Sequence, residues 1–204
     1  MKQFSILFFI VILGLVPSCK KFLDVVPDNI ATIENAFTQR TSAEKYLFTC
    51  FSYMPRHGNH DNNVAMTAGD EIWYMYPSRD VSTNFWNIAR GEQNASNPLG
   101  DFWSGDRGGT KLYQGIRDCN IFLENIGKVK DMNDSEKNRW IAEVKFLKAY
   151  YHFYLLRLYG PIPLVRQNLP ISSTPEETQV YREPVDSCFN YIVSLLDEAV
   201  CVVQ

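Results

Sequence analysis

The stretch from Trp140 to Leu164, WIAEVKFLKAYYHFYLLRLYGPIPL, constrains the fold more than any other part of the chain. Apolar residues recur in it at spacings of three and four, which places them on one face of an α-helix. They are Trp140, Val144, Leu147, Tyr151, Tyr154 or Leu155, and Leu158, and a second apolar set is Phe146, Ala149, Tyr150, Phe153 and Leu156. Only a narrow polar strip remains, through Lys145, Lys148 and His152. A helix that is apolar on more than one side belongs inside a helical stack.

The ends of this helix are also marked. Asn133, followed three residues later by Glu136, predicts a capping pair for the first free amide groups. Gly160 and Pro161 predict the stop, because Gly accepts a left-handed cap and Pro cannot continue the helical hydrogen bonds. Residues 162–165 then read as extended chain.

Three further helices are predicted by the same reasoning. The capping-box pattern Thr41-Ser42-Ala43-Glu44 predicts a helix that Pro55 closes, and a second helix is predicted over residues 111–126. Pro184 is a favourable first residue for a third, which runs to Ala199. These elements predict a mostly all-α chain whose helical hairpins stack as in tetratricopeptide proteins.

Two segments lack this periodicity. Residues 20–40 read as a tether that docks onto the first helix. From Arg56 to Thr110, Gly, Asn, Asp and Ser alternate with aromatic residues. Structureless loops of that length are uncommon inside a compact domain and are usually functional, and the aromatic content argues against disorder.

The N-terminus reads as a targeting segment. Lys2 precedes an apolar run over residues 4–16 that is too short for a membrane-spanning helix but suits a signal-peptide core. The run ends at Val16-Pro17-Ser18-Cys19, a lipobox-like sequence that predicts lipidation of Cys19 as the new N-terminal residue. The alternative is a plain secretory signal in which Cys19 is incidental.

The central stretch resembles the SusD/RagB family, surface lipoproteins that capture glycans and pass them to a TonB-dependent outer-membrane transporter. It matches most positions of the family run E-x-K-F-L-R-A-Y-x-Y-F-x-L-x-R-x-Y-G-x-I-P-L between Glu143 and Leu164, with Lys148 at the usual Arg position. Similar short matches occur at Cys19 to Asp24, from Trp103 to Leu123, and from Arg182 to Ala199, in the family's order.

The resemblance implies a domain organisation and a partner. Residues 1–18 would be a lipoprotein signal peptide, 19–40 a lipidated tether, and 41–204 the N-terminal helical domain, with the later part of the family fold absent. The protein would lie at the cell surface, anchored by lipid to the outer membrane, beside a SusC-like transporter. An isolated N-terminal portion would expose the apolar side of its last helix and bind glycan weakly.

The aromatic segment supplies candidate ligand-binding residues. A sugar ring rests its C–H face on Trp or Tyr, while its hydroxyl groups bond to polar side chains. Candidates of both kinds lie close together in sequence, namely Trp73, Tyr74, Tyr76, Arg79, Asp80, Asn84 and Trp86. The alternative is that several of these rings only pin the loop to the helices, and for Trp103 and Tyr113 we favour that scaffold role.

Other chemistries find little support. The formal charge of −3 argues against nucleic-acid binding. Gly105 to Gly109 lacks the Gly-Lys-Ser/Thr ending of a phosphate loop, and His57, His60 and Asp61 read as a solvated loop rather than a metal site. No carboxylate pair or catalytic triad stands out, so we predict no enzyme activity, metal or cofactor. A hydrolase is the weakest alternative, behind an interaction module that docks a transporter without binding glycan.

Four cysteines follow Cys19, at Cys50, Cys119, Cys188 and Cys201. Export would permit disulfides, and four cysteines allow three pairing schemes that the sequence cannot rank. The first three fall at apolar helical positions, which favours small buried thiols. No C-x-x-C motif is present.

Overall fold

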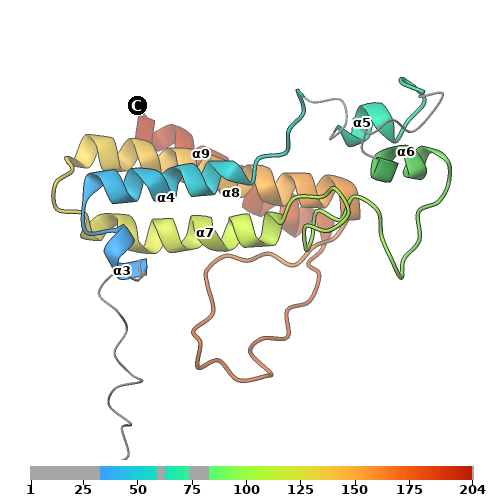
Figure 1. The fold of residues 1–204 in the computed structure, drawn as a ribbon. Coiled ribbons are helices and arrows are strands. Elements are labelled where there is room, and N and C mark those ends of the chain that lie inside the picture. The colour runs from blue at the N-terminus through green and yellow to red at the C-terminus, as the bar shows by residue number, and fades with distance from the viewer. Residues whose placement is uncertain (1–32, 59–62, 74–82, 204) are drawn as a thin grey trace, which may run out of the picture. The chain divides into compact units, whose positions relative to one another are not determined.

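The computed structural model describes residues 33–58, 63–73 and 83–203 (Figure 1). The chain divides into two units, 1–33 and 34–204, and helices α4 to α9 all belong to the second. The described residues contain helices and no strands, which confirms the all-α prediction. The helices are α3 (Ile33–Ala36), α4 (Arg40–Ser52), α5 (Val64–Thr67), α6 (Thr83–Ala89), α7 (Leu112–Asn125), the 3-10 turn η2 (Ile126–Lys128), α8 (Asp134–Tyr159) and α9 (Val185–Val203).

The central helix α8 organises the second unit. It packs against α9, α7 and α4, and Figure 1 shows these four helices running alongside one another. The side chain of Asn133 accepts a hydrogen bond from the Glu136 backbone N–H at 2.8 Å, and Gly160 ends the helix with φ of 68°. Both predicted ends are therefore confirmed. Whether the helical hairpins follow a tetratricopeptide repeat stays a prediction.

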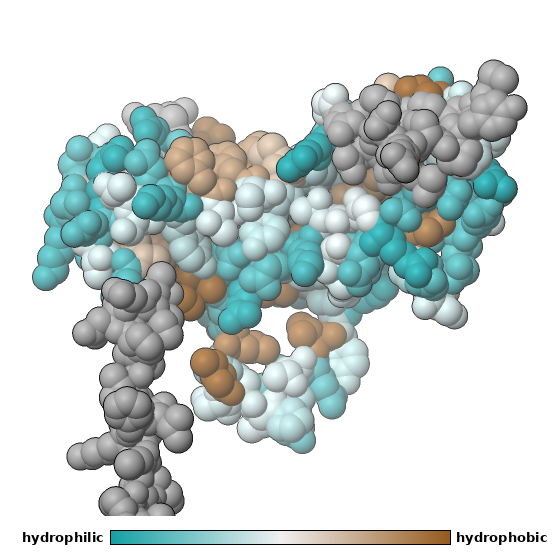
Figure 2. Space-filling view, viewed as in Figure 1, coloured by the Kyte–Doolittle hydropathy of each residue, from teal (hydrophilic) through white to brown (hydrophobic). Residues whose placement is uncertain are grey.

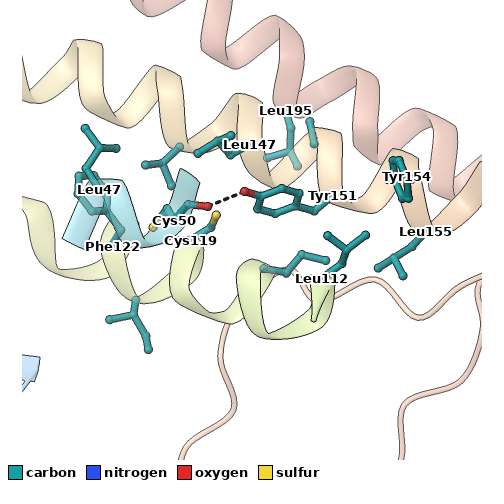
Figure 3. Close-up of a cluster of buried hydrophobic side chains, with 14 of the residues drawn as sticks. Leu47, Cys50, Leu112, Cys119, Phe122, Leu147, Tyr151, Tyr154, Leu155 and Leu195 are labelled. Carbon is teal, nitrogen blue, oxygen red and sulfur yellow. Dashed lines mark hydrogen bonds between the residues drawn. The ribbon is translucent and has the colours of Figure 1, made fainter. Parts of the chain in front are cut away.

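The core lies where α4, α7 and α8 meet (Figure 3). Tyr151 of α8 is fully buried, and its hydroxyl donates to the backbone carbonyl of Cys50 at 2.5 Å. Leu47 comes from α4, and Leu112 and Phe122 come from α7. A phenol that packs its ring among aliphatic groups and satisfies its hydroxyl on a neighbouring helix stabilises the core without leaving a polar atom unpaired.

The predicted capping box at the start of α4 is wrong. The helix begins at Arg40, and its N-cap residue, Gln39, makes no side-chain capping bond. The Arg40 backbone N–H donates instead to Asp131 at 2.7 Å, and its guanidinium pairs with Glu136 at 2.7 Å. Tertiary partners near the start of α8 thus satisfy the end of α4, which a local capping rule cannot foresee.

The predicted polar strip on α8 is also wrong at two of its three positions. Lys148 is 3% exposed and His152 is fully buried, whereas Phe146 and Phe153, predicted to be covered, are 47% and 38% exposed. The reason is the connection between α8 and α9, residues 160–184, which lies over Lys148 and His152 and supplies hydrogen-bond partners for both. The other side of α8 is the one left open.

The described parts of the segment between α4 and α7 contain short helices that the sequence pattern did not predict. The segment contains α5 and α6, and a compact Gly-rich turn before α7 in which the Gly105 N–H donates to Asp101 O and the Gly109 N–H donates to Asp106 O. A Cβ added to Gly109 would lie 1.9 Å from the Asp101 carbonyl oxygen, so the turn closes only with glycine there.

Candidate functional site

The candidate site is a cluster of side chains, Trp73, Trp86 and Arg90, that lie in sequence between α5 and the Gly-rich turn. Trp73 is 60% exposed, and its ring lies 5.7 Å from the ring of Trp86 at an angle of 54°. Trp86, on α6, is 8% exposed, and the guanidinium of Arg90 lies 4.7 Å from the centre of a Trp86 ring. Arg90 is in turn paired with Glu92 at 3.1 Å. The aromatic surface open to a ligand is therefore that of Trp73, with Trp86 and Arg90 as its support.

The support under Trp73 continues into the helical core. Phe85, the neighbour of Trp86, is fully buried and stacks on Phe102 at 6.1 Å and 13°. Phe102 contacts the ring of Tyr154 on α8 at 5.0 Å. A Cβ at Gly100, whose φ is 61°, would lie 2.3 Å from the Phe85 ring, so this close approach needs glycine. The rings of Phe85, Phe102 and Tyr154 thus link α6 to α8.

Hydrogen bonds also fix the chain between α6 and α7, next to these rings. The side chain of Gln93 bonds both backbone groups of Leu99, at 2.7 and 3.0 Å. Asp101 accepts from the Trp103 N–H at 2.8 Å and from the Ser104 hydroxyl. Burial would raise the pKa of Asp101, but these hydrogen bonds favour its charged form and hold the pKa below its ordinary value.

The sequence-predicted ligand residues are distributed unevenly over the structure. The fold brings Trp73 and Trp86 together and places Asn84, which is half-buried, on α6. Tyr74, Tyr76, Arg79 and Asp80 lie outside the described residues, as does the predicted lipidation residue Cys19.

Arg90 and Gln93 were not among the residues that the sequence pattern indicated for the site. Trp86 and Arg90 are four residues apart, a spacing that brings side chains together on a helix, and this could have indicated their contact. Gln93 gave no comparable signal, because its partner Leu99 lies in irregular chain and only the folded loop brings the two together.

Trp103 and Tyr113 lie in the scaffold, as predicted. Their rings are 4.7 Å apart, and Tyr159 contacts Trp103 edge-on at 5.7 Å. The Tyr113 hydroxyl donates to the carbonyl of Pro163 at 3.1 Å, and the Arg182 guanidinium lies 5.4 Å from the centre of a Trp103 ring. These rings join α7, α8 and the α8–α9 connection to one another.

The described part of the chain carries no metal or membrane signature. It holds no cluster of three or more His, Cys, Asp or Glu side chains suited to a metal ion. His57 is hydrogen-bonded to the Tyr150 hydroxyl at 2.8 Å, whereas His60 and Asp61 lie outside the described residues. None of the described helices combines the length and apolar character that crossing a bilayer requires.

Comparison with known proteins identifies the family. Residues 21–203 match the SusD-like family described as "Starch-binding associating with outer membrane". The chain belongs to this SusD-like family. No match was found among curated proteins.

Solved structures of SusD-like proteins share the fold. A "Laminarin binding SusD-like protein" superposes with a TM-score of 0.65 at 24% identity, over 81% of this chain and 34% of its own. A SusD-like protein from Bacteroides fragilis gives 0.61 at 24%, over 87% and 32%. "Surface glycan-binding protein A" from Bacteroides uniformis gives 0.59 at 19%, over 79% and 34%. At these identities the likeness shows the fold alone, and the chain spans about a third of the length of these proteins.

Proposed function

We propose that this SusD-like chain captures glycan, or another nutrient, as part of a surface lipoprotein and passes it to a TonB-dependent, SusC-like outer-membrane transporter. The observation that carries the proposal is the exposed ring of Trp73, backed by Trp86 and Arg90. Further support comes from the family description as starch-binding and from similar structures named as laminarin-binding and surface glycan-binding.

The geometry suits a sugar. A ring whose rear side is packed has little conformational freedom left to lose, so it offers a flat apolar platform for the C–H face of a pyranose. Asn84, on the same short helix as Trp86, and Tyr74, Tyr76, Arg79 and Asp80 in the adjoining sequence, supply partners for sugar hydroxyl groups. We include Trp86 in the proposed glycan site because its ring supports that of Trp73. We propose binding without catalysis, which an assay for released reducing sugar would check.

Isothermal titration with a panel of oligosaccharides tests this proposal. Base–aromatic stacking is worth about 1–3 kcal/mol per ring, and a 1 mM complex has roughly −4.1 kcal/mol in total. If sugar stacking is of similar size, Trp73→Ala should abolish detectable binding of a millimolar ligand. Tyr181→Ala is the matched control, since Tyr181 is 77% exposed but lies on the α8–α9 connection. Tight binding that survives both Trp73→Ala and Trp86→Ala would overturn the proposed site.

The alternative is a helical module that docks the transporter without touching glycan. One observation favours it, an apolar hollow of about 730 Å³ lined by α4, α8 and α9 residues that include Phe51, Phe146 and Val200. Co-purification with a SusC-like transporter separates the two candidates. The alternative expects Phe146→Gln to weaken co-purification while no glycan binds, whereas the main proposal expects Trp73→Ala to abolish glycan binding and leave co-purification intact.

A further inference from the structure

Two cysteines lie together in the core, one on α4 and one on α7. Cys50 and Cys119 are both fully buried, and both are free thiols in this structure. Figure 3 shows them beside each other, next to the hydrogen bond from Tyr151 to the Cys50 carbonyl. Nothing in the proposed glycan site uses either thiol.

The two helices pass this point in antiparallel register and at close range. Phe37, before α4, contacts Phe122, whereas Tyr53, after α4, lies against Gly115, so positions rise along one helix as they fall along the other. Cys50 and Cys119 lie between these two contacts. A Cβ built on Gly115 would be only 2.9 Å from Tyr53 Cβ, which is closer than the roughly 3.5–4.5 Å between the Cβ atoms of a disulfide. One helical turn from the cysteines, the backbones are thus near enough for a bridge.

Cys50 and Cys119 lie near each other on neighbouring helices, whereas the other two cysteines lie elsewhere (Figure 3). The neighbouring Cys50 thiol and burial both raise the pKa of the Cys119 thiol. Cys188 instead points its Sγ at the carbonyls of Ile162 and Glu183, at 3.7 and 3.6 Å, and Cys201 is exposed near the end of α9. Among these four cysteines, the fold therefore favours one bond, between Cys50 and Cys119, and leaves Cys188 and Cys201 as thiols.

We propose that Cys50 and Cys119 form a disulfide when the chain folds in an oxidising compartment. The two thiols give up two protons and two electrons to form one S–S bond, and a disulfide-bearing oxidant accepts these and becomes two thiols. Since buried, protonated thiols react slowly, the bond forms before α8 closes over the pair. It links α4 to α7 and closes the chain segment that carries Trp73 and Trp86.

Refolding with peptide mapping tests the proposal. The full-length chain carrying Cys19→Ser, which keeps that thiol out of the reaction, is reduced, unfolded and refolded with reduced and oxidised glutathione. It is then denatured and alkylated without reductant. We expect a peptide joined through Cys50 and Cys119, with Cys188 and Cys201 alkylated. Reductant should lower Tm by several degrees, because a disulfide that closes a long loop restricts the unfolded chain.

Matched variants separate the pair from the other cysteines. Cys188→Ala with Cys201→Ala should leave the bond intact, whereas Cys50→Ala with Cys119→Ala should make Tm independent of reductant. Alkylation at all four cysteines, or a bond to Cys188 or Cys201, would overturn the proposal. Peptide mapping of the chain with all four cysteines decides the matter even where the alanine variants do not fold. Because oxidised glutathione is added in the test, its result does not depend on where the protein lies in the cell. A Cys50–Cys119 bond in a chain that binds no glycan would therefore contradict the proposed function and leave the disulfide proposal standing.

Discussion

His152 lies in the core with both ring nitrogens bonded to the backbone. Nδ1 is 2.7 Å from the carbonyl of Lys148, and the N–H of Val165 donates to Nε2 at 3.4 Å. Since a carbonyl only accepts, Nδ1 carries the proton and Nε2 is the acceptor, which is the neutral imidazole. Tyr191 of α9 meets the ring edge-on at 5.4 Å. His152 thus joins α8 to the α8–α9 connection only while it is uncharged.

The charges around His152 also favour its neutral form. Burial lowers its pKa from 6.5 to about 4, and the cations of Lys148 and Arg166 act in the same direction. Burial also lowers the pKa of Lys148 to about 8, although its ammonium donates to the carbonyl of Arg166 at 2.6 Å. Arg166 pairs with Glu183 at 2.5 Å, so this carboxylate moderates the positive field.

The first prediction is a loss of stability in acid through His152. Between pH 6.5 and pH 4 the unfolded chain protonates this histidine and the folded chain does not, so stability falls as pH falls. The full effect is on the order of 3 kcal/mol, and about 2 kcal/mol is lost by pH 5. Urea midpoints at pH 7 and pH 5 should move apart more in the parent than in His152→Gln. Equal shifts in the two proteins would mean that His152 does not titrate in this range.

A second prediction concerns Cys19 as the site of the membrane anchor. Cys19 is proposed to carry the lipids, and because stable anchoring requires two or more acyl chains, its loss should release the protein from the membrane. Cys19→Ser, followed by cell fractionation, should move the protein out of the membrane pellet, whereas Cys201→Ser should not. A Cys19→Ser variant that pellets as fully as the parent would place the anchor elsewhere.

Among the helices, α8 is the one against which most of the others pack. Its buried side chains include Tyr151, Tyr154 and Leu155, and the helix packs against α4, α7 and α9 at once. Since α4 is distant from α8 in sequence whereas α7 and α9 are its neighbours along the chain, α8 fixes both near and distant segments in place. Removal of a side chain here leaves a cavity that several helices would have to close together.

The element-scale prediction is a strong position dependence along α8. Leu155 is fully buried, so Leu155→Ala should cost on the order of 2–5 kcal/mol, a large part of a domain stability of roughly 5–15 kcal/mol. Phe153→Ala, two residues away at 38% exposure, is the control and should cost much less. Denaturant midpoints measure both. Similar losses for the two variants would mean that Phe153 is covered in solution.

Over the whole described unit, one apolar surface stands out. Figure 2 shows hydrophobic side chains gathered in the region where α4 passes α8 and α9. The hollow there is lined by Phe51, Ala142, Phe146, Leu196, Ala199 and Val200, with Arg139 and Glu143. Phe146 is 47% and Val200 is 59% exposed. Contiguous apolar surface of this kind favours association.

The whole-molecule prediction is that this hollow binds apolar probes and promotes self-association. Phe146→Gln should reduce fluorescence of a hydrophobic dye and lower the sedimentation-derived mass at high concentration, with Tm nearly unchanged. Ile171→Gln is the control, because Ile171 is fully exposed but lies on the α8–α9 connection, outside the hollow. An equal effect of both substitutions would point to general surface hydrophobicity rather than to this hollow.

For the candidate site, the sequence predicted the residue types and the structure decided their roles. Trp73 and Trp86 were equivalent candidates, since each is a Trp in an irregular segment. Only the fold shows that Trp86 is packed between Trp73 and Arg90 while Trp73 faces solvent. Exposure depends on what covers a ring, and Trp86 is covered because the folded segment brings the Trp73 ring and the Arg90 guanidinium onto it.

For the fold, local sequence signals were enough to predict the long helices and the ends of α8, because helical period, the Asn133 cap and the Gly160 stop act within a few residues. The tertiary structure alone decided which side of α8 meets water. In sequence the side with Lys148 and His152 is the more polar one, but the α8–α9 connection covers it and brings carbonyl and N–H groups that bond to these two side chains. Burial of a polar group costs free energy unless such partners are present, and those partners are set by the path of the chain in space.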